Sequence, residues 1–212
     1  MIIPLQHHHI PHAARVFVEA FSHEAFTRRW LSPSSRWQRR AFTDLVSLVL
    51  SLNLRCRQPF RTAWRNGTMA GVLFLTRPAA GSILDGIGTV LFRLPHFLRL
   101  CVRMSRAWPY RRATTPPASL RPPYWTVAAV AVSSAHRGHG IGKALIAHAR
   151  ELCAQDSSAR GLYLFTGDQH NRVIYERWGF SLLEKRHTAD LTSYHLFAPP
   201  HSNTDTPASP TD

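Results

Sequence analysis

The stretch Val130-Ala-Val-Ser-Ser-Ala-His-Arg-Gly-His-Gly-Ile-Gly-Lys-Ala-Leu145 decides the fold of this chain. It joins the end of a strand, a polar turn, a glycine-rich loop and the start of a helix. Residues 125–132 are almost wholly apolar and lie between Pro122-Pro123 and Ser133-Ser134, which predicts a buried strand. After the loop, apolar residues recur at helical spacing as far as Cys153, which predicts an amphipathic helix.

The glycine-rich loop has the features of an anion site. Gly138, Gly140 and Gly142 keep side chains away from the backbone just before the predicted helix. Backbone N–H groups at a helix N-terminus have no partner within the helix, and the helix dipole is positive there. The loop therefore predicts a phosphate-binding site, with a turn that only eases helix–strand packing as the structural alternative.

Two common phosphate-binding motifs do not fit this loop. A P-loop is excluded because Gly138 stands one position too close to Gly142, and because Ala144 follows Lys143 where a serine or threonine is needed. A dinucleotide fingerprint, Gly-x-Gly-x-x-Gly or Ala, is also excluded. Its third position is occupied by Lys143 if the motif starts at Gly138, and by Leu145 if it starts at Gly140.

What remains is Arg137-x-x-Gly140-x-Gly142 after a strand that ends in Val-Ala-Val. This pattern resembles the acyl-CoA signature of the GNAT superfamily of N-acetyltransferases, in which these amides hold the CoA pyrophosphate. The resemblance implies acetyl-CoA as co-substrate, no metal, and a cofactor site made by Val130, Ala131, Val132, Arg137, Gly138, His139, Gly140, Ile141, Gly142 and Lys143.

A second stretch strengthens the resemblance. Gly167-Asp-Gln-His-Asn-Arg-Val-Ile-Tyr-Glu-Arg-Trp-Gly-Phe180 follows a short apolar run and is similar to the late GNAT segment. The resemblance implies that Asn171 contacts CoA and that Tyr175 is the general acid that protonates the CoA thiolate. The alternatives are a helix-capping role for Asn171 and a core-packing role for Tyr175. The likeness is specific over residues 123–183, and over 10–76 it extends only to the pattern of elements.

The remaining elements follow from periodicity and turn signals. Strands are expected at 1–5, 161–166, 180–186 and 193–197, and helices at 11–21, from Ser34 or Ser35 to about 54, and at 170–178. Asn66-Gly67 between two apolar runs predicts a hairpin over 60–76 with a primed turn. Two further helical segments are expected at 82–92 and 95–108.

Together these elements predict an α/β fold. We expect a GNAT-like mixed, mostly antiparallel sheet of six to seven strands flanked by helices, with an inserted helical segment before the cofactor strand. A single domain would span 1–197, with the helical insert at about 78–122. Residues 198–212 contain no core-forming side chains and are expected to be a disordered tail.

Composition limits the functional classes. The chain has 212 residues and a formal net charge of +14, carried almost entirely by arginine, since Lys143 and Lys185 are the only lysines. The arginines are spread over every element, so no nucleic-acid partner is expected. Three cysteines without paired spacing favour the cytoplasm, and no apolar run is long enough to span a membrane. His7-His8-His9 is not expected to bind a metal, because adjacent side chains do not converge on one ion.

The function implied is transfer of an acetyl group from acetyl-CoA to a primary amine by direct attack. The acceptor, a small molecule or a peptide, is left open, as is a homodimer. No carboxylate lies within 125–132, and Glu19, Glu24, Asp85 and Asp168 have no spacing that assigns one of them as general base. The alternatives are an acyl-CoA-binding sensor or partner-binding module without turnover and, third, a basic nucleic-acid-binding protein.

Overall fold

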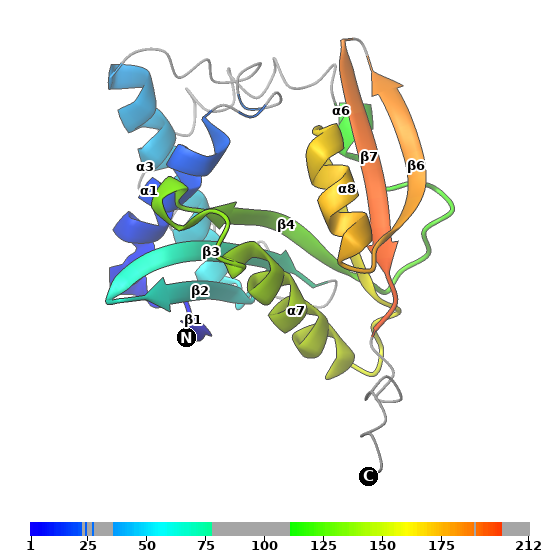
Figure 1. Ribbon diagram of the computed structural model, residues 1–212, viewed down its shortest axis with the longest axis horizontal. Helices are drawn as coiled ribbons and strands as arrows, with labels where there is room; N and C mark the ends of the chain where they lie inside the picture. The colour runs from blue at the N-terminus through cyan, green and yellow to red at the C-terminus, as the bar shows by residue number, and fades with distance from the viewer. Residues whose placement is uncertain (23, 25–26, 28–35, 78–110, 189, 201–212) are drawn as a thin grey trace.

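The computed structural model describes residues 1–22, 24, 27, 36–77, 111–188 and 190–200. Its centre is a seven-stranded sheet with the order β1-β2-β3-β4-β5-β7-β6 (Figure 1). Neighbouring strands are antiparallel except β4 and β5, which run parallel. The expected mixed and mostly antiparallel sheet is confirmed.

The elements follow one another in the expected order, with small shifts at their ends. They are β1 (Ile2–Pro4), η1 (His7–His9), α1 (Ile10–Phe21), α3 (Arg36–Arg55), β2 (Phe60–Arg65), β3 (Thr68–Thr76), α6 (Arg111–Thr114), β4 (Trp125–Val132), η3 (Ser134–His136), α7 (Ile141–Ala154), β5 (Leu162–Thr166), α8 (Gln169–Arg177), β6 (Ser181–Thr188) and β7 (Leu191–Ala198). The helices expected at 82–92 and 95–108 lie outside the described residues, as do residues 201–212 of the expected tail 198–212. The start of that tail was wrong, because Ala198 is the fully buried last residue of β7.

The hairpin between β2 and β3 has the turn that its sequence predicts. Asn66 has φ 49° and Gly67 has φ 72°, so both central residues take the left-handed conformation of a primed turn. That turn matches the twist of the two flanking strands, which explains why Asn-Gly is a reliable hairpin signal.

Helices cover both faces of the sheet (Figure 1). On β3, Val72 belongs to the core under α1 and α3, whereas Leu73 and Leu75 belong to the core under α7. This alternation follows from the period of two in a strand and explains why β3 is apolar on both sides. Helix α8 joins the α7 side, where Tyr175 and Trp178 pack against the same core.

Strand β4 pairs with its parallel neighbour β5 over only two residues and then diverges from it. The divergence leaves an opening between the two strands. Its pairing with β5 covers Trp125 and Thr126, whereas its pairing with β3 continues to Val132. Phe74 pairs with Ala129 and Leu75 with Val127, so Ala128 is an extra residue and β4 carries a bulge. A bulge bends a strand and redirects its side chains, and this one stands where β4 turns away from β5.

Helix α6 and the irregular segment after it pack on the face of β5, β7 and β6 that is opposite α8. Arg186 on β6 donates hydrogen bonds from Nη1 to the carbonyl oxygens of Arg112 and Thr115, the latter at 2.9 Å. Beneath them, Ala113, Leu191 and Phe165 form a small core of their own. Residues 115–124, which include the end of the helical insert expected at about 78–122, form no helix or strand in the structure.

The described residues show neither a membrane-spanning helix nor a metal-binding cluster. None of their helices combines the length and the hydropathy that crossing a membrane requires. No group of three or more histidine, cysteine, aspartate or glutamate side chains in this part of the chain is placed to hold a metal ion.

Candidate functional site

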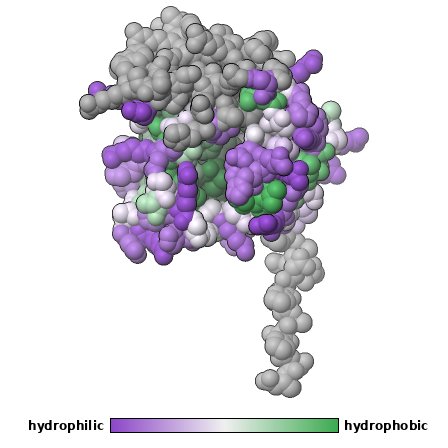
Figure 2. Space-filling view, turned by 45° about the horizontal axis from the view of Figure 1, so that its top comes forward, coloured by the Kyte–Doolittle hydropathy of each residue, from purple (hydrophilic) through white to green (hydrophobic). Residues whose placement is uncertain are grey.

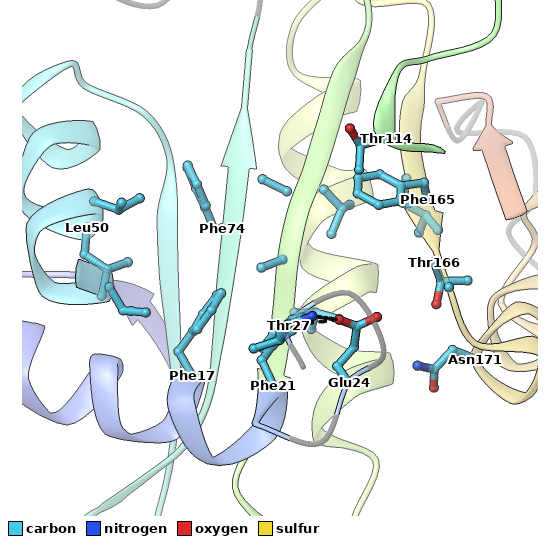
Figure 3. A pocket seen from close by; sticks show the side chains of 18 of the residues that line it. Phe17, Phe21, Glu24, Thr27, Leu50, Phe74, Thr114, Phe165, Thr166 and Asn171 are labelled. Atoms are coloured by element: carbon cyan, nitrogen blue, oxygen red, sulfur yellow. Dashed lines mark hydrogen bonds between the residues drawn. The ribbon is translucent and has the colours of Figure 1, made fainter. Parts of the chain in front are cut away.

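A cavity of about 450 Å³ lies where β4 and β5 diverge (Figure 3). Strand β4 contributes consecutive residues to its wall, because the bulge at Ala128 interrupts the usual alternation. The lining residues are Phe17, Phe21, Glu24, Thr27, Phe42, Leu45, Val46, Val49, Leu50, Phe74, Thr114, Val127, Ala128, Ala129, Val130, Leu164, Phe165, Thr166, Gly167, Asn171 and Tyr175. The cavity is thus mainly apolar, with a few polar groups on its wall.

Asn171 lies on the β5 side of this cavity, at the start of α8. The helix is capped by Asp168, whose Oδ1 accepts hydrogen bonds from the backbone N–H groups of His170 at 2.7 Å and Asn171 at 3.4 Å. The capping role considered for Asn171 therefore belongs to Asp168. The amide side chain of Asn171 is left to line the cavity.

Tyr175 lies one helical turn after Asn171, so both side chains project from the same face of α8 into the cavity. Its ring also packs edge-on against Trp178 and Phe180, with centroid separations of 5.6 Å and 5.9 Å. Burial raises the pKa of the Tyr175 phenol to about 12, so that the phenol keeps its proton at neutral pH. The side chain combines core packing with a position at the cavity wall.

Glu24 is the one acidic side chain among the described residues that line the cavity. Its Oε2 accepts hydrogen bonds from the backbone N–H of Thr27 at 2.9 Å and from Thr27 Oγ1 at 3.3 Å. The carboxylate projects between the helical wall and the side that carries Asn171 (Figure 3). Its spacing in the sequence gave no indication of this position, because Glu24 follows the end of α1 and reaches the cavity only through the packing of α1 on β4.

The other candidate carboxylates lie elsewhere. Glu19 on α1 accepts a hydrogen bond at Oε1 from the backbone N–H of Ser134 at 2.8 Å, and hydrogen bonds from Ser134 hold the pKa of Glu19 below its usual value. It therefore fixes the turn that follows β4. Asp168 caps α8, and Asp85 lies outside the described residues.

The glycine loop stands at the N-terminus of α7, directly after β4 and η3. Gly138 and Gly140 have φ of 77° and 75°, and a Cβ added at either would meet nothing within 4 Å. The side chains of Arg137, His139 and Lys143 are exposed around this open backbone. Free N–H groups, open space and nearby basic side chains are the conditions for binding a phosphate.

Gly142 has a different role from the other two glycines. A Cβ there would lie 3.3 Å from Cη2 of Trp178 and 3.7 Å from Cγ2 of Val132. This glycine lets α7 approach α8 and the end of β4 closely. The packing alternative considered for the whole loop therefore applies to Gly142, whereas Gly138 and Gly140 are required by backbone conformation.

The predicted cofactor residues fall into two groups joined by β4. Val130 and Asn171 line the cavity, whereas Ala131 and Val132 pair with β3 beyond it. The loop residues Arg137, Gly138, His139, Gly140, Ile141, Gly142 and Lys143 are not among those that line the cavity. A ligand that used both groups would have to be elongated and run along the open edge of β4.

Comparison with known proteins identifies the domain. Residues 97–182 match the family described as acetyltransferase (GNAT) domain. The chain contains a GNAT acetyltransferase domain. The match covers the glycine loop, Asn171 and Tyr175, and it confirms both the family and the enzyme class, an acyltransferase, that the sequence predicts.

Solved structures with the GNAT fold match nearly the whole chain. One from Corynebacterium glutamicum, described as histone acetyltransferase HPA2 and related acetyltransferase, is 23% identical with a TM-score of 0.67, over 96% of this chain and 98% of that one. The ribosomal-protein-alanine N-acetyltransferase from Brucella melitensis is 15% identical with a TM-score of 0.59, over 94% and 99%. The ribosomal-protein-S18-alanine N-acetyltransferase from Escherichia coli is 14% identical with a TM-score of 0.53, over 97% of both chains. At these identities the likeness establishes the fold.

Proposed function

We propose that the protein is an N-acetyltransferase that transfers the acetyl group of acetyl-CoA directly to a primary amine. The observation that carries this proposal is the divergence of β4 from β5. It opens a cavity lined by Asn171 and Tyr175, on the same strand that leads to the glycine loop. An elongated thioester with a phosphate-rich end fits this arrangement, since one end of the site is apolar and the other offers an anion site.

The reaction requires little beyond positioning and one proton donor. The amine nitrogen forms a bond to the thioester carbonyl carbon, and the carbon–sulfur bond breaks. The leaving thiolate takes the phenolic proton of Tyr175, and the proton lost by the nitrogen goes to a base or to water. Among the described residues no hydrogen bond to another protein group uses the Tyr175 hydroxyl, so it is available to the sulfur. The tyrosine then regains its proton from solvent.

The thioester carbonyl needs a hydrogen-bond donor as charge develops on its oxygen. Among the strands of the described residues, none pairs with the β5 side of β4 after Thr126, and alternate backbone N–H groups of a strand point to each side. We assign the N–H groups of Val130–Val132, and those of 127–129 next to the cavity, to this role and to the pantetheine arm wherever they point away from β3. Arg137 and the amides around Gly140 are assigned to the pyrophosphate.

Ligand-induced stabilisation tests the proposed site directly. Acetyl-CoA should raise the melting temperature, because a ligand that binds the folded chain alone stabilises it. In the double variant Arg137→Ala with Gly140→Val the shift should disappear, because charge and backbone access are both lost. A matched control, Arg160→Ala with Gly67→Val, changes an exposed arginine and another glycine of positive φ away from the loop. It should keep the shift.

The same assay separates the alternatives. Stabilisation by acetyl-CoA without thiol release for any amine would identify a sensor rather than an enzyme. Stabilisation by an oligonucleotide and not by CoA would favour a nucleic-acid-binding protein and contradict the proposal. An unchanged acetyl-CoA shift in the loop variant would place the phosphate site elsewhere.

A further inference from the structure

The helical wall of the cavity is built from aromatic and aliphatic side chains. Phe17 and Phe21 stack on one another with centroids 4.4 Å apart, and Phe42 meets Phe17 edge-on at 6.5 Å. The other members from α3 and β3 are Leu45, Val46, Val49, Leu50 and Phe74. None of these residues carries a polar side-chain group, so this wall can bind only an apolar body.

Two polar residues of the cavity lie apart from that wall. Thr166 and Asn171 come from the β5 side, opposite Phe17 and Phe21 (Figure 3). In the space-filling view, hydrophobic surface is visible in a hollow between two more hydrophilic parts of the molecule (Figure 2). The apolar wall and the side that carries Tyr175 are thus two different sides of one cavity.

Glu24 stands between these two sides and is positioned for a cation. Both hydrogen bonds that it accepts within the described chain go to Oε2, which leaves Oε1 for a ligand. Thr27, which is buried, holds the carboxylate in place. A fixed carboxylate at the edge of an apolar wall suits one ammonium group attached to a hydrophobic body.

The lack of basic side chains among the described lining residues further restricts the chemical class of the ligand. No lysine, arginine or histidine is among the described lining residues, so a carboxylate on the acceptor would find no counter-ion there. A single glutamate cannot pair with several ammonium groups, and the net charge of +14 repels polycations. Free amino acids and polyamines are therefore both disfavoured.

We propose that the acceptor is a hydrophobic monoamine, an arylalkylamine or alkylamine without a carboxylate, whose ammonium pairs with Glu24 and whose body packs on the α1–α3 wall. This inference rests on the proposed acetyl transfer. Glu24, directly or through a water molecule, takes one proton from the ammonium, so that the neutral nitrogen attacks the thioester carbon. The second proton passes from the nitrogen to water as the amide forms. Tyr175 protonates the leaving thiolate and then regains its proton from solvent.

The test measures thiol release from acetyl-CoA with four amines of different charge. 2-Phenylethylamine should be used with kcat/KM at least ~100-fold above phenylalanine, spermidine and a peptide with an N-terminal alanine. Phenylalanine differs from 2-phenylethylamine only by its carboxylate, so this pair isolates the missing counter-ion. Preference for phenylalanine, spermidine or the peptide would overturn the inference.

Three variants test whether Glu24 and the apolar wall cause the preference for 2-phenylethylamine. Glu24→Gln keeps an oxygen for Thr27 but removes the charge, and it should raise KM for 2-phenylethylamine at least ~10-fold with an unchanged acetyl-CoA Kd. Val49→Thr has nearly the same volume but adds a hydroxyl to the wall, and it should raise the same KM several-fold. Asp44→Asn removes an exposed carboxylate of α3 outside the cavity and should change neither constant.

The remaining outcomes separate this inference from the proposed function. A protein that binds acetyl-CoA in calorimetry but acetylates no hydrophobic amine would refute the inference and leave acyl-CoA binding intact. If hexanoyl-CoA replaced acetyl-CoA with higher kcat/KM and no amine were preferred, the wall would hold the acyl chain instead, which also refutes it. Absence of acetyl-CoA binding would refute the proposed function itself.

Discussion

Tyr163 Oη and Nδ1 of His195 lie 2.7 Å apart in a buried hydrogen bond between β5 and β7. On its other side His195 meets Ser193, whose Oγ lies 3.1 Å from Nε2. His195 is fully buried, and burial, together with the positive charge of Arg186, lowers its pKa to about 4. The imidazole is therefore neutral in the folded protein, and this network joins two strands rather than serving the cavity.

The buried His195 predicts a loss of stability in mild acid. In the unfolded chain its pKa returns to about 6.5, so between pH 6.5 and 4 the unfolded state binds more protons than the folded state. The stability that depends on a neutral His195 is fully present above pH 6.5 and is lost as the pH falls towards 4. The free energy of unfolding should decrease by up to about 3 kcal/mol over this range. Urea denaturation at several pH values between 7.5 and 4.5 measures it. His195→Gln should flatten the dependence.

The control for this experiment is His170→Gln, since His170 is exposed on α8. That variant should keep the pH dependence of the wild-type protein. If His195→Gln and the wild type lost stability equally from pH 6.5 to 4.5, the acid sensitivity would come from another group.

Tyr175→Phe should separate catalysis from packing. The substitution keeps the ring and its contacts with Trp178 and Phe180 but removes the acidic proton. We expect kcat to fall ~10²-fold or more with little change in the acetyl-CoA Kd. Because the phenol pKa is raised to about 12, the wild-type enzyme should not lose this acid at any pH below about 11. Single-turnover thiol release, with calorimetry for binding, checks both statements.

Tyr124→Phe is the matched control, since Tyr124 is a partly buried tyrosine that does not line the cavity. It should leave kcat near the wild-type value. A Tyr175→Phe enzyme with wild-type kcat would show that this tyrosine only packs, and the thiolate would then take its proton from elsewhere.

Gly161 before β5 should tolerate no side chain. Its φ is 149°, and a Cβ there would collide with the carbonyl oxygen of Ala198 and the ring of Phe197. Because backbone strain and a backbone clash combine, Gly161→Ala should lower the free energy of unfolding by about 3 kcal/mol. Chemical denaturation measures the loss.

Gly67→Ala provides the comparison for strain alone. Gly67 also has positive φ, but a Cβ there would meet nothing within 4 Å, so a loss of about 1 kcal/mol is expected. Equal losses in the two variants would contradict the clash at Gly161.

Much of the fold was predictable because its signals are local. The bounded apolar run of 125–132, the helical spacing after Gly140 and the Asn66-Gly67 turn each act over a few residues, and the strand, helix and turn that they predict are present in the structure. The conformation of the glycine-rich loop belongs with them, since the left-handed φ of Gly138 and Gly140 follows from a turn that must end at a helix N-terminus. The late segment placed Asn171 and Tyr175 on one helix face for the same reason.

Sequence reasoning left open the role of Glu24, one of four candidate carboxylates, and missed other features that depend on distant packing. Glu24 lines the cavity because α1 lies across β3 and β4, and no spacing within the chain records that contact. The bulge at Ala128 is invisible in an apolar strand, because it is defined by the register with β3. Gly142 resembles its neighbours in the loop, yet its role is set by Trp178, which directly follows another helix, α8.

The sequence by itself determined the family, the order of the elements and the left-handed glycine loop before α7, because short-range turn geometry and hydrophobic periodicity dictate them. Only the tertiary structure decided the shape and the charge of the acceptor side. That side forms where α1, α3 and the two diverging strands meet, and long-range packing alone brings Glu24 and Phe17 to the same cavity as Tyr175.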